Sequence, residues 1–281
     1  MGATSSVTGS VKRTAQKVAL NPVMETLTRI GYGVRGLIYI TMGLLAAQVA
    51  LGKGGALASP QGALAAIGRQ PAGSILLWVI LVGIISYSAW GFVRAVLDPL
   101  HKGHDLKGLL ARFGYLISAF SYAFLALPTY GYITGVSHKT NGSQTEKLLT
   151  SIMRMPWGRL AIGILGLVAL AGGLYQIYLG FKAGFDRQFK IYVLSPEELK
   201  LAIDIGRFGT AARGIVFAVV GGLITLGAYR ANPHQPVGID TALATLLHQP
   251  YGVWLLGVVA LGLIAFGFYS ILSALWFRLK R

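Results

Sequence analysis

The sequence predicts an all-α membrane protein: a polytopic bundle of six transmembrane helices, built from three repeated helical hairpins in a pseudo-threefold arrangement. Its 281 residues are 54% hydrophobic and only 12% charged. Apolar runs of about twenty residues recur, which is the length needed to cross about 30 Å of hydrocarbon. The start of one helical hairpin is also written three times along the chain. A membrane β-barrel is not expected, because the alternating segments of about ten residues that it requires are not evident.

Six spans account for the apolar runs. They cover residues 30–50, 73–94, 112–134, 158–181, 208–229 and 252–276. The chain has a net charge of +16, and its basic residues flank these spans, most of all in the N-terminal tail, the second and fourth loops and the C-terminus. The positive-inside rule therefore places both termini in the cytoplasm. Because the basic residues do not gather with aromatic ones on a soluble module, no nucleic acid is expected as a partner.

The same pattern opens each odd span. An arginine is followed by glycine two residues later and by an aromatic residue ten residues later. The arginines are Arg29, Arg112 and Arg207, and the aromatic residues are Tyr39, Tyr122 and Phe217. The even spans open with Pro-x-Gly and carry an aromatic residue nineteen residues past the proline. These prolines are Pro71, Pro156 and Pro250, and the aromatic residues are Trp90, Tyr175 and Tyr269.

The repeats divide the chain into a tail and three parallel hairpins. The N-terminal tail covers residues 1–27, the first hairpin 28–97, the second 98–185, and the third 186–281 with a basic C-terminus.

Each outer loop carries signals for a short helix ahead of its Pro-x-Gly. Ser59 and Pro60 supply a cap and a first-turn proline. Ser143 and Glu146 form a capping box, and Asp240 is the expected cap of the third segment. Because these segments are too short to span the membrane, we expect helices that lie on the outer interface.

The openings RIGYGVRGLIY, RFGYLISAFSY and RFGTAARGIVF, each followed by a second helix, resemble the bacterial family called domain of unknown function 1206. The similarity covers nearly the whole chain from about residue 25. The resemblance implies the repeated two-helix fold and a place in the bacterial cytoplasmic (inner) membrane, but no activity. The middle repeat departs from the others, because Ser118 stands where they have Arg35 and Arg213.

Arg35 and Arg213 are the sharpest functional candidates. Each lies six residues past the boundary arginine of its span, about 9 Å deeper along the helix. An arginine at the bilayer midplane costs about 2.5–3.5 kcal/mol, but one this close to the surface can snorkel for less. One interpretation is that both reach back to lipid phosphates or helix-end carbonyls. The other is an inward ring, joined by the boundary arginines Arg29, Arg112 and Arg207, that binds an anion or a lipid headgroup.

Other polar and aromatic residues within the spans are candidates for lining a pocket. They are Tyr39, Tyr122, Ser118, Ser121, Gln176 and Pro128, the last because a proline kink frees a carbonyl beside Thr129, Tyr130 and Tyr132. Plain kinking and interhelical hydrogen bonding explain the same residues. A stripe of small residues predicts close helix packing instead, and comprises Gly36, Gly43, Ala47, Gly214 and Gly221.

Catalysis, cofactors and metals are not expected. The chain has no cysteine, only nine acidic residues, and none of the usual catalytic motifs. His101, His104 and Asp105 lack a further ligand for a metal. We therefore expect a non-enzymatic transporter or channel for a small solute, which the repeated arginines suggest is anionic. The alternative is a non-transporting accessory or lipid-binding structural protein. Membrane lipids are the expected partner, while a protein partner and a homo-oligomer are left open.

Overall fold

The computed structural model describes residues 22–98, 103, 105–136, 151–182, 196–231 and 238–276, and these residues form helices and no strand. The helices are α2 (Pro22–Ala50), α3 (Pro60–Gly68), α4 (Gly73–Leu97), α5 (Leu106–Thr134), α7 (Gly158–Phe181), α8 (Pro196–Tyr229), α9 (Ile239–Leu247) and α10 (Gly252–Trp276). Most of the N-terminal tail, the capping box at Ser143 and Glu146, the pair His101 and His104, and the basic C-terminus lie outside the described residues.

Six of the described helices are long and apolar enough to cross a membrane: α2, α4, α5, α7, α8 and α10. They match the six predicted spans, which confirms an all-helical, multi-pass membrane fold. Four helices continue past the predicted limits, because α2 begins at Pro22, α5 at Leu106 and α8 at Pro196, and α4 ends at Leu97. The extension of α4 places Arg94 inside a helix instead of at the start of a loop.

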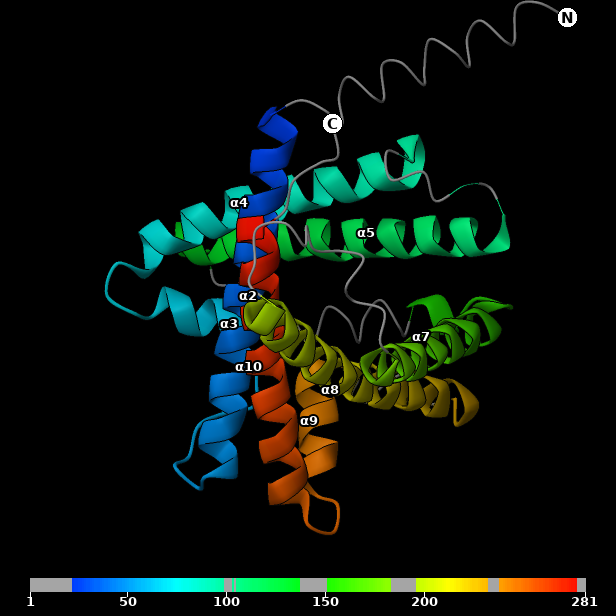
Figure 1. Cartoon of the computed structure of the whole chain (residues 1–281). Coiled ribbons are helices and arrows are strands. Elements are labelled where there is room, and N and C mark those ends of the chain that lie inside the picture. The colour runs from blue at the N-terminus through cyan, green and yellow to red at the C-terminus, as the bar shows by residue number, and fades with distance from the viewer. Residues whose placement is uncertain are drawn as a thin grey trace, which may run out of the picture.

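The most extensive helix contacts join different repeats: α4 with α5, α7 with α8, and α10 with α2 (Figure 1). Small residues make this close approach possible. A Cβ atom added to Gly36 would lie 2.7 Å from the carbonyl oxygen of Gly267, and one added to Gly214 would lie 2.7 Å from that of Gly173. Since real Cβ atoms do not approach this closely, the backbones themselves are in contact. The predicted small-residue stripe is confirmed.

The hairpins themselves are not equivalent. In the first, α2 packs on α4, and in the third, α8 packs on α10, whereas α5 and α7 make no extensive contact among the described residues. The three pairs between repeats follow the predicted repetition, but one hairpin does not close. The pseudo-threefold arrangement is therefore not confirmed.

The short helices α3 and α9 pack into one end of the bundle. Ser59 caps α3 as predicted, because its hydroxyl oxygen accepts a hydrogen bond from the Gly62 amide at 3.4 Å. The expected cap of α9 is wrong: Gly238 holds the N-cap position and Asp240 lies in the first turn. Leu64 of α3 and Leu243 of α9 are fully buried. The apolar faces of α3 and α9 therefore pack against the membrane-spanning helices.

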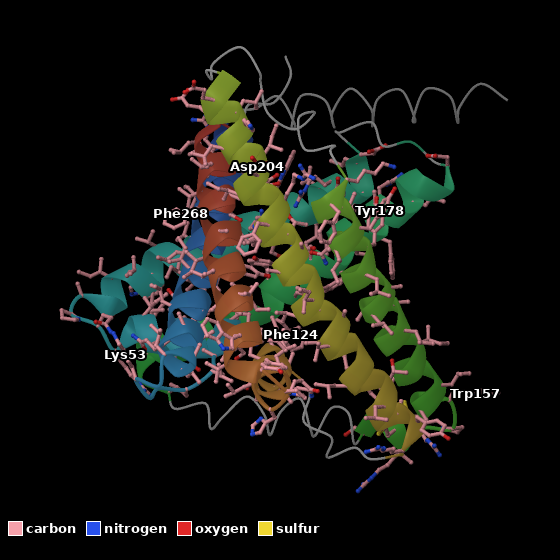
Figure 2. All side chains as sticks on the ribbon, turned by 60° about the horizontal axis from the view of Figure 1, so that its bottom comes forward. Lys53, Phe124, Trp157, Tyr178, Asp204 and Phe268 are labelled. Atoms are coloured by element: carbon pink, nitrogen blue, oxygen red, sulfur yellow. The ribbon has the colours of Figure 1, made fainter. Side chains whose placement is uncertain are left out.

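The two ends of the bundle are clearly distinguished. Lys53 and Trp157 lie toward one end and Asp204 and Tyr178 toward the other (Figure 2). The second end also carries Arg207, which pairs with Asp204 at 3.9 Å. We call the end at which the odd spans begin the basic end.

Candidate functional site

Three arginines point into the bundle near the basic end: Arg35 on α2, Arg94 on α4 and Arg213 on α8. We call them the arginine row. Two aromatic rings connect them. The guanidinium carbons of Arg94 and Arg35 lie 5.5 Å and 5.8 Å from the ring centre of Tyr87. Those of Arg35 and Arg213 lie 5.0 Å and 4.9 Å from the ring centre of Phe266. The row thus crosses the bundle from α4 to α8.

Arg35 joins three helices. Its Nε donates to the hydroxyl of Ser270 on α10 at 3.2 Å, and its Nη1 donates to the hydroxyl of Tyr87 on α4 at 3.2 Å. Its guanidinium carbon lies 4.7 Å from the ring centre of Tyr32. Ser270 and Tyr87 are both buried. The side chain therefore turns toward the centre of the bundle and does not reach back to its own helix end.

Arg213 has the same repeat position and a similar setting. Its guanidinium carbon lies 4.8 Å from the ring centre of Phe217 and 5.5 Å from that of Tyr39. Its Nε is buried and has no hydrogen-bond partner among the residues that the structure describes. Cation–π contacts stabilise the charge by about 0.5–2 kcal/mol each, but they leave N–H donors unpaired. Arg213 therefore has a free donor for a ligand.

Arg94 was missed as a site residue, because the sequence places it among the basic residues that flank a loop. It is only 6% exposed, and its guanidinium carbon lies 4.6 Å from the ring centre of Tyr115 on α5 and 5.8 Å from that of Trp90. Within the described ranges, its Nε and Nη2 have no hydrogen-bond partner. One sequence signal was available, since the apolar run continues beyond Arg94 to Leu97.

The row carries positive charge that no carboxylate balances. Among the described residues, none of its three arginines forms an ion pair. An unpaired buried charge is strongly unfavourable, and a buried donor without a partner costs about 1–3 kcal/mol. An anion that accepts these N–H groups removes both costs through charge-assisted hydrogen bonds. No group of three metal-ligating His, Asp or Glu side chains occurs in the described part of the chain. Anion binding is therefore the chemistry that this arrangement supports.

The boundary arginines lie elsewhere. Arg112 donates from Nε to the carbonyl of Ala95 at 2.8 Å and from Nη2 to that of Val96 at 2.9 Å. Arg207 makes the equivalent bonds to the last carbonyls of α7, at 3.0 Å to Gly180 and 2.8 Å to Phe181. A cation at the C-terminus of a helix is favoured by its dipole. These two residues thus terminate the preceding even helix, and Arg29 lies within α2 at the same end.

The pocket-lining candidates are divided between the row and other places. Tyr39 and Tyr122 belong to it, since Tyr39 contacts Arg213 and the ring centre of Tyr122 lies 4.5 Å from that of Tyr87. Ser118 lies between Tyr115 and Tyr122 on α5. The other three lie apart from the row. Ser121 is exposed, Gln176 donates to Gly172 within α7, and Pro128 lies inside an unbroken α5, where Thr129 donates to Leu125.

The comparisons with known proteins agree with the repeats but assign no activity. The sequence matches the family described as Domain of Unknown Function (DUF1206) over residues 30–98, 113–183 and 208–276. It is 31% identical over 260 residues to the uncharacterized protein YxxB of Bacillus subtilis (strain 168), covering 92% of this chain and 94% of that protein. No solved structure matches.

Proposed function

Because the chain belongs to the DUF1206 family, whose description gives no activity, we propose a function from the site: it binds a small anionic solute in the arginine row and transports it across the membrane. One observation carries the proposal. Three arginines are held inside a membrane-spanning bundle, and within the described part of the chain Arg94 and Arg213 have unpaired N–H groups and none of the three forms an ion pair.

The placement of the row also supports transport. Arg35 and Arg213 lie about 9 Å inside the boundary arginines, so an anion bound there has already left the headgroup region. We place the basic end in the cytoplasm of a bacterium, with the protein in the inner membrane, because its loops and termini hold most of the basic residues. The row then receives its anion from the cytoplasmic side. We propose no catalytic step, cofactor or nucleic-acid partner.

The test is uptake by purified protein in liposomes of phosphatidylcholine. The probes are radiolabelled orthophosphate, sulfate and acetate, with the Arg35→Gln/Arg213→Gln double variant compared with wild type. Each lost charge-assisted hydrogen bond is worth about 1.5–3 kcal/mol, so we expect uptake of the transported probe to fall at least about tenfold. Arg69→Gln is the matched control, because Arg69 is exposed at the C-cap of α3.

The result that overturns transport is equally definite. If the double variant has the thermal stability of wild type and takes up every probe at the wild-type rate, the row does not carry solute. A non-transporting, lipid-binding role is the second candidate. It is favoured by the dense packing of the bundle centre, where Met42, Ile38 and Trp90 are fully or almost fully buried.

A further inference from the structure

In the second hairpin, α5 and α7 are apart at the repeat positions where the two helices of the other hairpins are in contact; we call the second hairpin open and the other two closed. A Cβ atom on Gly31 of α2 would lie 2.7 Å from the Cβ of Tyr87 on α4. The same two repeat positions meet in the third hairpin, where a Cβ atom on Gly209 would lie 2.8 Å from the Cβ of Phe266. In the second hairpin these positions are Gly114 and Gly172, and a Cβ atom on either would meet nothing within 4 Å.

A second set of positions, deeper in the bundle, gives the same result. Gly83 of α4 contacts Val34 and Ile30 of α2, and Gly262 of α10 contacts Ala212 of α8. Their counterparts in the second hairpin are all exposed: Val168 by 47%, Ile117 by 43% and Phe113 by 53%. The aromatic residue that recurs on each even helix differs in the same way: Trp90 and Tyr269 are buried, whereas Tyr175 is 60% exposed.

The exposed face is continuous along both helices. On α5 it recurs every three or four residues, as does its counterpart on α7. The α5 residues are Phe113, Ile117, Phe120, Phe124 and Leu127, and the α7 residues are Leu165, Val168, Gly172 and Tyr175. Phe124, which Figure 2 labels, is 65% exposed. Within a bilayer, an apolar face of this length is matched by acyl chains.

Of these two helices, α5 contacts the arginine row and α7 packs on α8, which carries Arg213. Tyr115 of α5 lies against Arg94, and Tyr122 of α5 stacks on Tyr87. On the other side, α7 packs on α8 at Gly214, the residue that follows Arg213. The apolar face between α5 and α7 is thus bordered on one side by a helix that contacts the row and on the other by a helix packed against α8, where Arg213 keeps an unpaired Nε within the described part of the chain.

We propose that an anionic phospholipid occupies this open hairpin, with its acyl chains between α5 and α7 and its phosphate at the arginine row. The inference rests on the anion-binding part of the proposed function, because it takes the row as an anion site and assigns that anion to a lipid phosphate in place of a free small solute. Two features select the ligand. A phosphate offers several acceptor oxygens to guanidinium donors, and the small side chains of Ser118 and Gly172 leave room where the other hairpins have arginine and an aromatic ring.

Native mass spectrometry of the purified protein tests the proposal. The probes are phosphatidylglycerol, phosphatidylcholine, and two soluble anions, inorganic phosphate and glycerol 3-phosphate. Gly172→Phe places a ring where the other hairpins have one, and Gly257→Phe is its control because a Cβ atom there also meets nothing within 4 Å. Arg213→Gln removes one charge of the row.

We expect wild type to retain phosphatidylglycerol about tenfold better than phosphatidylcholine. Gly172→Phe and Arg213→Gln should lose that preference while Gly257→Phe keeps it. The proposal is overturned if both lipids are retained equally, or if Gly172→Phe and Gly257→Phe bind alike. It is also overturned if inorganic phosphate or glycerol 3-phosphate displaces the lipid at millimolar concentration. That last outcome leaves anion binding intact, because a small anion then occupies the row. If no probe distinguishes wild type from Arg213→Gln, the proposed function fails with it.

Discussion

Disulfide crosslinking can measure directly whether the second hairpin is open. The chain contains no cysteine, so pairs can be introduced without competing thiols. One pair is Val34→Cys with Gly83→Cys, in the first hairpin. The other is Ile117→Cys with Val168→Cys, at the same repeat positions of the second hairpin. The two pairs differ only in the hairpin that they probe.

The structure gives opposite expectations for the two pairs. A Cβ atom on Gly83 would lie 3.1 Å from the Cβ of Val34, and disulfides need a separation of about 3.5–4.5 Å. Replacing Val34 also removes the methyl group that this Cβ would meet, so a shift of a few tenths of an ångström admits the bond. Ile117 and Val168 are exposed on helices that do not pack on each other, and their cysteines are out of reach.

The assay is copper–phenanthroline oxidation of isolated membranes, followed by labelling of free thiols with a polyethylene-glycol maleimide and gel electrophoresis. Most of the first pair should resist labelling, whereas the second pair should be labelled on both cysteines. The four single-cysteine variants control for access to the reagent. Equal crosslinking of both pairs would refute the open hairpin, and the lipid proposal that depends on it.

Two further predictions concern the contacts between repeats. Gly214→Ala should lower the free energy of unfolding by about 1–3 kcal/mol because it overpacks the contact between α7 and α8. In the control Gly222→Ala the added Cβ meets nothing within 4 Å, so that variant should be neutral or stabilising by up to about 1 kcal/mol. Thermal unfolding in detergent measures both, and equal effects would contradict the close approach. Arg207→Met keeps the apolar stem but removes two hydrogen bonds to the end of α7. It should lower the free energy of unfolding by about 1–2 kcal/mol and leave anion uptake unchanged. A loss of uptake at unchanged stability would show that Arg207 belongs to the binding site.

The sequence predicts the spans and the repeats well because each rests on a strong local signal. Apolar length identifies a span, and the recurring Arg-x-Gly and Pro-x-Gly openings identify the hairpins. Helix pairing is harder to predict, because a small-residue stripe shows that a face packs closely without naming its partner. Gly36 and Gly214 were correctly assigned to close contacts, but their partners Gly267 and Gly173 lie in other repeats.

The site was predicted only in part, for a reason of geometry. At the depth of Arg35 and Arg213, a long side chain can reach either the headgroups or the bundle centre. Hydropathy cannot separate these outcomes, because they differ only in rotation about the helix axis. Arg94 was missed for the opposite reason, since a residue near a predicted boundary was counted as a flanking charge.

Ser118, Gly172 and Arg94 together explain how the middle repeat differs from the other two. In the sequence, Ser118 stands where the other two repeats have Arg35 and Arg213. In the structure, the second repeat also lacks the ring at Gly172, and Arg94 on the neighbouring helix lies against Tyr115 of α5. The row therefore still has three arginines, but none of them projects from α5. A ligand that enters between α5 and α7 would pass apolar, aromatic and small side chains before it meets charge, which is the arrangement that an amphipathic anion requires.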